Sequence, residues 1–269
     1  MLVNVRLVNT RWLVALVVLG AFLSTFRLCA EELRVDTEIL VGEGQPPIAK
    51  YLTIFSNGRV YDFMLAPQNE ITIYDQRRGK FDLIDTKKQL RTTITTEELQ
   101  SFIGKVKNFA LREGKVSLIA PELEISFNET EHLLECKGSP VTYTVQGETA
   151  RTAKIASDYR EFADWSIQLS SMRQHTLPPF ARLIVNGHLA DRGLLPKQVT
   201  RQVVVGGLLR KKTQLTRSLH TLSGKLSSKD RQRIEEAGAL LSGEFREVSL
   251  PEYLREVDLA VRPTNQKAG

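Results

Sequence analysis

Cysteine is scarce in this sequence, which contains only Cys29 and Cys136 among its 269 residues. Cys29 falls in an N-terminal segment that we expect to be removed, which would leave Cys136 alone and allow no intramolecular disulfide. A chain of this length, with 42% hydrophobic residues, can bury enough apolar surface to fold without one. We therefore expect a single domain over residues 31–262 and a disordered tail over residues 263–269.

A long hydrophobic run is also missing, because the apolar segment Trp12–Phe26 is shorter than the about 20 residues of a membrane-spanning helix. Arg6 and Arg11 precede this segment, and Ala30 follows it. A basic start, an apolar middle and a small residue before the cut are typical of a secretory signal peptide. The prediction is a signal peptide over residues 1–30 and a protein that is exported, periplasmic or secreted. An anchor formed by an uncleaved N-terminal segment is the alternative, and membrane contact is expected only through this segment.

Positive charge is present but not concentrated. The formal net charge is +6, and residues 1–30 hold three arginines and no acid, so their removal leaves +3. A charge this small gives no reason to expect a nucleic-acid partner. The one basic cluster is Arg210–Lys212 with Arg217, which we interpret as cations that protect a solvated strand edge. The alternative is a contact to phosphate or anionic lipid.

The sequence lacks the usual motifs of catalysis and metal binding. It contains no Gly-x-Ser-x-Gly elbow, no Walker loop and no Gly-x-Gly-x-x-Gly that opens a helix after a strand. Its four histidines, which have no metal-binding spacing, are His132, His175, His188 and His220. We therefore predict a non-catalytic protein with no cofactor and no metal site.

Two arrangements would nevertheless allow hydrolysis. Cys136 could act as a thiol nucleophile with His132 or His175. A pair of carboxylates in the predicted sheet could provide an acid and a base, and the candidates are Asp62, Asp75, Asp82 and Asp85. A lone buried cysteine and turn carboxylates are the simpler interpretations, so an envelope hydrolase is the alternative hypothesis.

What the sequence does contain is a clear β-hairpin. Asn57-Gly58 lies between the alternating runs Tyr51–Phe55 and Val60–Met64. A two-residue type I′ turn needs positive φ at both central positions, which Asn and Gly tolerate best. The turn predicts that Leu52 lies opposite Phe63 and that Ile54 lies opposite Tyr61, so that these four side chains form one apolar face.

The second hairpin admits two registers. A four-residue loop would pair Thr72 with Leu83 and mix polar with apolar residues on both faces. A loop of Arg77–Gly79, with Gly79 in the left-handed region, instead aligns apolar residues of both strands. Those residues are Ile71, Ile73, Phe81 and Leu83. We favour the three-residue loop.

A helix is predicted directly after the strand Leu90–Ile94. Thr95 and Glu98 have the spacing of a capping box, and apolar residues then recur at helical intervals until Gly114, a suitable stop. We expect this helix to cover the apolar face of the first hairpin.

The rest of the chain predicts an α+β fold with a curved, mostly antiparallel sheet of about 8–10 strands packed against three to four helices. Three short strands are expected to continue the meander, followed by two helices, a long antiparallel pair and a last helix. The further strands expected are Glu31–Val41, Glu122–Asn128, Leu133–Lys137, Val141–Val145, Lys197–Val205 and Leu209–Leu222. The helices expected are Ala150–Met172, Pro178 to Arg192 and one that begins after Ser227.

The stretches Leu52–Phe63, Ile71–Asp75 and Phe81–Asp85 resemble the periplasmic lipoprotein-carrier superfamily: a strand, a turn with Gly, an aromatic strand and a strand that ends in Tyr-Asp. The resemblance covers about residues 51–85, and no long helix precedes the first hairpin as it does in that family. It implies an open half-barrel wrapped on helices, with an apolar cavity for lipid or acyl chains.

The second face of the first hairpin is the candidate ligand-binding surface. It carries Tyr51, Phe55, Val60 and Met64. Our hypothesis is a non-catalytic exported protein of the bacterial cell envelope that binds a hydrophobic or lipid-like ligand between sheet and helices. A filled core between two helix layers is the alternative structure, and a structural or assembly protein that contacts another envelope protein is the alternative function.

Overall fold

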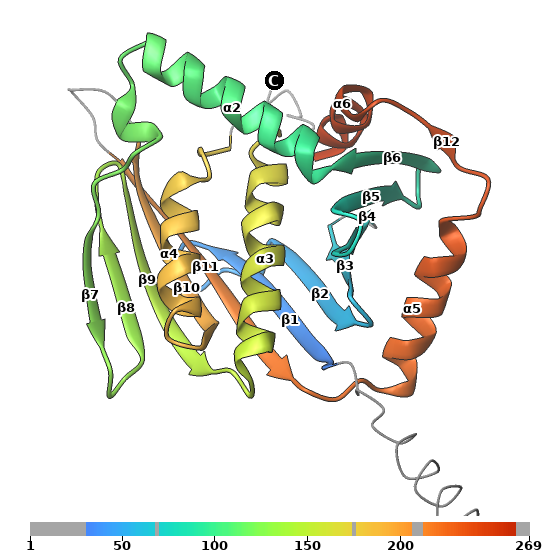
Figure 1. Cartoon of the computed structure of the whole chain (residues 1–269), viewed down its shortest axis with the longest axis horizontal. Coiled ribbons are helices and arrows are strands. Elements are labelled where there is room, and N and C mark those ends of the chain that lie inside the picture. Colours follow the sequence, from blue (N-terminus) through green and yellow to red (C-terminus); the bar gives the residue numbers. More distant parts are fainter. Residues whose placement is uncertain (1–30, 68–69, 174–175, 206–211, 262–269) are drawn as a thin grey trace, which may run out of the picture. The chain divides into compact units, whose positions relative to one another are not determined.

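Twelve strands form one curved, open sheet in the computed structural model, and all neighbouring strands run antiparallel except β12 and β6 (Figure 1). The structure describes residues 31–67, 70–173, 176–205 and 212–261. The strands are β1 (Leu33–Val41), β2 (Ala49–Ser56), β3 (Arg59–Ala66), β4 (Glu70–Asp75), β5 (Lys80–Asp85), β6 (Leu90–Thr95), β7 (Glu124–Asn128), β8 (Leu133–Lys137), β9 (Val141–Thr149), β10 (Leu194–Val205), β11 (Lys212–Ser223) and β12 (Arg246–Glu247). The predicted signal peptide and C-terminal tail lie outside the described residues.

Five α-helices accompany the sheet in the described part of the chain, together with a 3-10 turn at Val116–Leu118. The helices are α2 (Thr96–Arg112), α3 (Ala153–Ser170), α4 (Phe180–Ala190), α5 (Ser228–Leu240) and α6 (Leu250–Val261). The α+β class and the mostly antiparallel sheet are confirmed, with more strands and helices than predicted. Of the described helices, none combines the length and apolar character needed to span a membrane.

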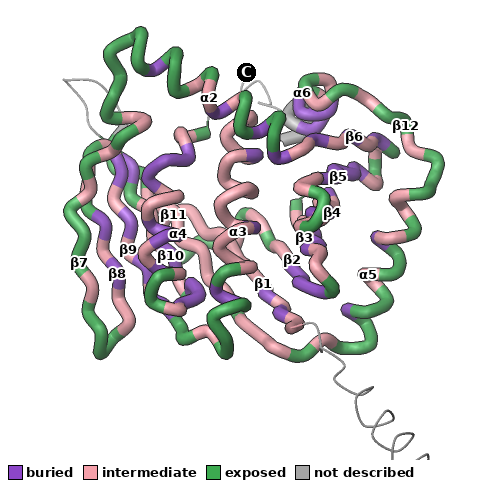
Figure 2. The backbone as a smooth tube through the Cα atoms, viewed as in Figure 1, coloured by how far each residue is buried: buried purple, intermediate pink, exposed green. Residues whose placement is uncertain are grey.

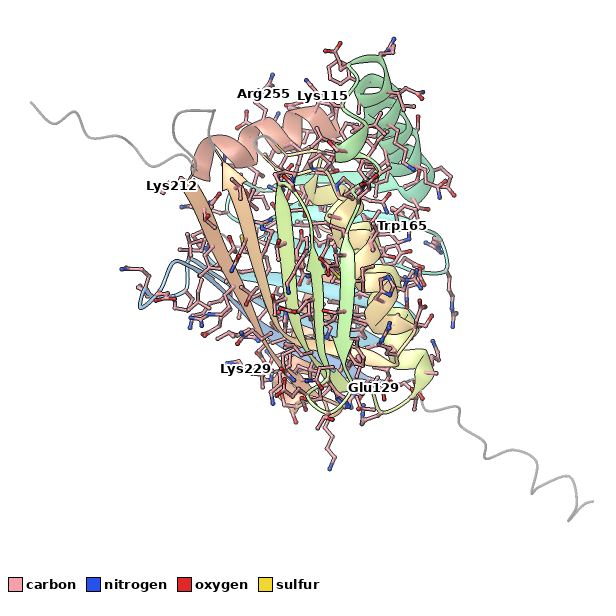
Figure 3. All side chains as sticks on the ribbon, turned by 90° about the vertical axis from the view of Figure 1, so that its left-hand side faces the viewer. Lys115, Glu129, Trp165, Lys212, Lys229 and Arg255 are labelled. Carbon is pink, nitrogen blue, oxygen red and sulfur yellow. The ribbon has the colours of Figure 1, made fainter. Side chains whose placement is uncertain are left out.

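The strand order is β12-β6-β5-β4-β3-β2-β1-β11-β10-β9-β8-β7, so the opening strand lies in the middle of the sheet. The prediction that β7–β9 continue the first meander is wrong. They form the opposite edge, because β9 pairs with β10 and β10 pairs with β11, which joins β1. The interpretation of the basic cluster as a strand edge is wrong for Arg217, which pairs with Leu40 of β1 and with Thr200 of β10. Lys212, at the start of β11 (Figure 3), pairs with Val205 of β10. Arg210 and Lys211 lie outside the described residues.

The first hairpin forms as predicted. Asn57 and Gly58 have φ values of 55° and 73°, as a type I′ turn requires. Leu52 pairs with Phe63, and Ile54 pairs with Tyr61.

The register predicted for the second hairpin is wrong. Thr72 pairs with Leu83, and Tyr74 pairs with Phe81, so the loop has four residues. The alternation argument fails because both faces of this part of the sheet are buried, which removes the reason to keep all apolar residues on one face. The rings of Tyr74 and Phe81 stack with centroids 4.3 Å apart, a contact that the other register would break.

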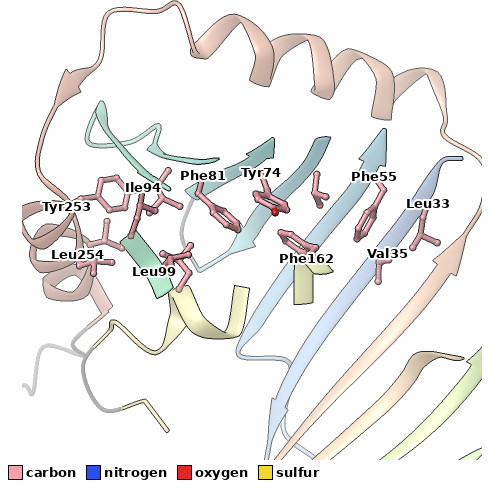
Figure 4. Close-up of a cluster of buried hydrophobic side chains, with 14 of the residues drawn as sticks. Leu33, Val35, Phe55, Tyr74, Phe81, Ile94, Leu99, Phe162, Tyr253 and Leu254 are labelled. Carbon is pink, nitrogen blue, oxygen red and sulfur yellow. The ribbon is translucent and has the colours of Figure 1, made fainter. Parts of the chain in front are cut away.

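The capping box of α2 is confirmed. Thr95 Oγ1 accepts from the backbone N–H of Glu98, and the Glu98 carboxylate accepts from the N–H of Thr95. The expectation that this helix covers the apolar face of the first hairpin is wrong. Leu52 and Phe63 pack instead against α5, through Ala237 and neighbouring apolar residues. The chain leaves β6 toward the other face of the sheet, where Leu99 of α2 joins the cluster that contains Phe81 (Figure 4).

The helices divide between the two faces of the sheet. Buried residues of α2, α3 and α6 share one cluster with Phe55, Val60 and Phe81 on one face of β2–β6, while α5 packs on the opposite face. On β8–β10, α4 packs on the α3 side (Figures 1 and 3). Figure 2 shows the result as nearly continuous burial along β5 and alternating burial along β9.

Helix α6 was not predicted. Leu250, Tyr253, Leu254 and Val257 recur at helical spacing, and the last three are buried in the large cluster. The short strand β12 precedes it and pairs with β6, so the segment after α5 closes one edge of the sheet.

Candidate functional site

A cavity of about 370 Å³ lies between the sheet and the pair α3 and α4. Its floor comes from β1, β2, β3, β9, β10 and β11, and its cover comes from α3 together with Arg182 of α4. One part of its wall is apolar, with Val35, Ile39, Phe162, Ile167 and Val199. The cavity therefore has a surface on which an apolar chain can pack.

Two arginines line the same cavity. Arg182 lies on α4 with its guanidinium carbon 5.9 Å from the centre of the Tyr143 ring. Arg201 lies on β10 directly opposite Tyr143 of β9, so Tyr143 neighbours both cations. Arg201 donates to Thr216 Oγ1 at 3.4 Å, while its Nε is buried with no hydrogen-bond partner. Within the described part of the chain, neither arginine has a carboxylate at ion-pair distance.

His220 is a third polar group with an unused nitrogen. Its Nδ1 lies 2.9 Å from Thr37 Oγ1, and its Nε2 is buried without a partner. Burial, together with the charge of Arg182, lowers the pKa of His220 to about 4. The ring is therefore neutral at physiological pH, with one nitrogen left to bond a ligand.

Asp62 is the one carboxylate among the residues that line this cavity. It accepts a hydrogen bond of 2.6 Å from Thr53 Oγ1. The pKa of Asp62 is raised to about 6, chiefly by burial; the Thr53 hydrogen bond lowers it and the charge of Glu70 raises it. Burial also raises the pKa of Tyr51 and of Tyr159 to about 12, so both phenols remain available as donors.

The structure brings one of the four predicted ligand-binding residues to the cavity. Tyr51 lines it. Phe55 and Val60 lie on the same face of the sheet but are buried in the core, where the Phe55 ring meets Phe162 edge-on at 5.7 Å. Met64 pairs with Tyr51 across the hairpin and does not line the cavity.

The sequence analysis named Tyr51 and Asp62 as candidates but missed Arg182, Arg201 and His220 of the cavity. Val199, Arg201 and Val203 share one face of β10. Arg201 is therefore a charged residue on the otherwise apolar face of an alternating strand. That irregularity was visible in the sequence. Arg182 and His220 carried no comparable signal, because their neighbourhood is created only when α4 and β11 assemble.

Cys136 is fully buried in the cluster beneath α4, and burial raises the pKa of its thiol to about 11. A thiol with this pKa is rarely ionised at neutral pH, which argues against the nucleophile hypothesis. His132 lies in the turn before β8 with φ of 49°, and His175 lies outside the described residues.

The other three predicted carboxylates have partners of their own. Asp75 contacts Arg59 at 3.2 Å, and Asp82 accepts from Thr93 at 2.8 Å. Asp85 accepts from the backbone N–H groups of Lys87 and Lys88, which makes it a turn residue. No group of three or more potential metal-ligating side chains occurs in the residues that the structure describes.

A larger depression of about 630 Å³ lies at the ends of β8–β11, lined by His132, Glu148 and Lys197 among others. His220 is common to this depression and to the cavity under α3. The depression lacks an apolar wall comparable to that under α3, so the cavity is the better candidate site.

No protein-family model matches the chain, and no curated protein matches it. Among solved structures, one described as "Structure of PNGF-II in P21 space group" is 7% identical, with a TM-score of 0.36. The match covers 85% of this chain and 33% of that chain, so this chain spans about a third of the length of that neighbour. At this TM-score the likeness carries no argument about fold or function.

Proposed function

We propose that this is a non-catalytic exported protein of the bacterial cell envelope that binds a lipid-like ligand between the sheet and the helices α3 and α4. In this proposal the curved sheet acts as an open half-barrel around the two helices. The supporting observation is the cavity of about 370 Å³, which joins an apolar wall to polar groups without partners. Its volume falls within the about 300–1,000 Å³ that is usual for small-molecule sites.

The position of the cavity also supports binding. Except at Tyr51, Thr53 and Asp62, which line the cavity, β2–β6 are packed on both faces by side chains of α2, α3, α5 and α6. The cavity borders this packed part, because Phe162 of α3 belongs to the core cluster and also lines the cavity. An open cavity with both apolar and polar lining residues, next to a densely packed core, offers a surface on which a small amphiphilic ligand can bind.

Binding of a neutral apolar fluorophore, N-phenyl-1-naphthylamine, tests the proposal. The protein is unfolded and refolded to remove bound lipid, and fluorescence is titrated with the probe. Ser166→Trp places a large side chain in the cavity from α3, whereas Ser126→Trp makes the same change at an exposed position of β7. We expect saturable binding by the unmodified protein and by Ser126→Trp, and at least a tenfold weaker affinity in Ser166→Trp. Absence of saturable binding, or equal affinities in both variants, would contradict the proposal.

A further inference from the structure

The charges in the cavity are not balanced. Two guanidinium groups, Arg182 and Arg201, line it with one carboxylate, Asp62. Asp62 is engaged by Thr53 and forms no ion pair with either arginine in the described part of the chain. The arginines thus bring positive charge to a cavity whose lining has a single acid, and that acid is hydrogen-bonded to Thr53.

The two cations converge on one side chain. Arg182 approaches the Tyr143 ring from α4, and Arg201 is the residue directly opposite Tyr143 in the sheet. Directly opposite residues of an antiparallel pair have Cβ atoms about 5 Å apart and point to the same face. Arg182 therefore approaches Tyr143 from α4, while Arg201 shares its face of the sheet and donates to Thr216 of β11.

Part of the hydrogen-bonding capacity of the cavity is unused. Arg201 donates to Thr216, but its Nε is buried without an acceptor. His220 Nε2, four residues farther along β11 than Thr216, is also buried without a partner. Buried donors in folded proteins nearly always have acceptors, and those that lack them call for a physical explanation. A bound oxyanion would supply acceptors to the arginine Nε and to the guanidinium of Arg182, because a guanidinium fork matches the geometry of a carboxylate or phosphate.

We infer that the ligand is an amphiphile with an anionic oxygen head group, a carboxylate or a phosphate, that binds between Arg182 and Arg201 while its apolar tail packs against Val35, Ile39 and Phe162. This inference rests on the proposed function, since it names the class of ligand for the same cavity. The tail supplies nonspecific burial, and the head group supplies orientation and selectivity.

Competition among three ligands of equal chain length tests the head group. Dodecanoate, dodecyl phosphate and 1-dodecanol are each titrated against bound N-phenyl-1-naphthylamine on the unmodified protein, so the comparison does not depend on the folding of a variant. We expect at least one of the two anions to bind at least tenfold more tightly than the alcohol. Whichever anion binds better distinguishes a carboxylate from a phosphate head group.

Variants then assign the preference to residues. Arg182→Met and Arg201→Met keep much of the side-chain volume and remove the charge, and each should weaken binding of the preferred anion about tenfold while leaving dodecanol affinity unchanged. Arg192→Met is the matched control, because Arg192 also lies over an aromatic ring, that of Phe127 at 4.7 Å, but outside the cavity. It should leave all three affinities unchanged.

The outcomes separate the two proposals. Equal affinities for the alcohol and both anions would overturn the head-group inference and leave the binding function standing. A preference for anions that survives both Arg182→Met and Arg201→Met would overturn the assignment to these arginines. If neither the fluorophore nor any of the three ligands binds, the proposed function itself is wrong and the inference falls with it.

Discussion

The two halves of the sheet are built differently. Strands β2–β6, the two-sided half, have α5 on one face and α2, α3 and α6 on the other. Strands β7–β11, the one-sided half, have their main helical cover from α4 on one face, and Thr142, Thr144 and Gln146 on the other face of β9 are polar and half-buried. The cavity spans the middle of the sheet, from β9–β11 across β1 to Tyr51, Thr53 and Asp62 of β2 and β3. The comparison teaches that β2–β6 have a packed core on both faces, whereas β9 and β10 have a packed core on one face and border the cavity.

The difference can be traced to single positions. Leu52 and Ile54 make the α5 face of β2 apolar, while Tyr74 and Phe81 make the opposite face apolar too, so both faces exclude water. Strand β9 alternates apolar with polar residues, as a strand covered on one side does. In β10 the inward series is interrupted by Arg201, whose guanidinium makes this part of the cavity lining polar.

The largest expected effect is the loss of stability when a buried aromatic side chain in each half of the sheet is replaced by Ala. Phe81 is fully buried and stacks on Tyr74, so Phe81→Ala should lower the free energy of unfolding by about 4 kcal/mol. Tyr143 is also buried but neighbours the cavity, so Tyr143→Ala enlarges an existing space and should cost roughly half as much. Urea unfolding measures both. A cost for Tyr143→Ala equal to that for Phe81→Ala would remove the distinction between a filled and a hollow half.

A smaller effect concerns the pH dependence of stability. The folded state holds the proton of Asp62 more tightly than the unfolded state does, because burial raises the Asp62 pKa from 3.8 to about 6. Stability from this group therefore falls as pH rises from about 4 to about 6. His220 acts in the opposite sense, because burial lowers its pKa from 6.5 to about 4, so its contribution is lost as pH falls through that range.

The two opposing slopes can be separated by variants. Asp62→Asn can still accept from Thr53, and its stability relative to the unmodified protein should rise by about 2 kcal/mol between pH 4 and pH 6.5. His220→Gln should show the reverse, a relative loss of similar size over the same range. Thermal or urea unfolding at both pH values checks the sign. If the stability of both variants depends on pH in the same way as that of the unmodified protein, Asp62 and His220 are more hydrated than the cavity geometry indicates.

The sequence predicted those features whose cause is local. The Asn57-Gly58 turn and the Thr95 capping box each depend on a few adjacent residues, and each is found in the structure. Which face a helix covers depends on residues far apart in the chain. Helix α5, which starts more than 170 residues after Leu52, takes the place expected for α2.

The candidate site was harder to predict than the fold. Tyr51 was found because it belongs to the hairpin, whose alternation identifies both faces. Arg182, Arg201 and His220 come from α4, β10 and β11, and they share a cavity only because β11 pairs with β1 and brings these elements beside β2. These three residues lie in different segments, so the spacing of residues within one segment cannot predict that they meet. The sequence pattern shows only that Arg201 is a charged residue among the apolar positions of β10.

The smallest expected effect compares the caps of two helices that pack on opposite faces of the sheet, of which α3 covers the cavity and α5 does not. Ser227 Oγ accepts from the backbone N–H of Asp230 at the start of α5, and Thr152 Oγ1 accepts from that of Ile155 at the start of α3. Replacing either residue by Ala should cost about 1 kcal/mol of stability, because one helix N–H loses its acceptor. Binding should tell them apart: α5 does not contribute to the cavity, so Ser227→Ala should leave probe affinity unchanged, whereas Thr152→Ala loosens the helix that covers the cavity and should weaken it. Equal probe affinities in the two variants, at equal loss of stability, would mean that α3 does not control access to the cavity.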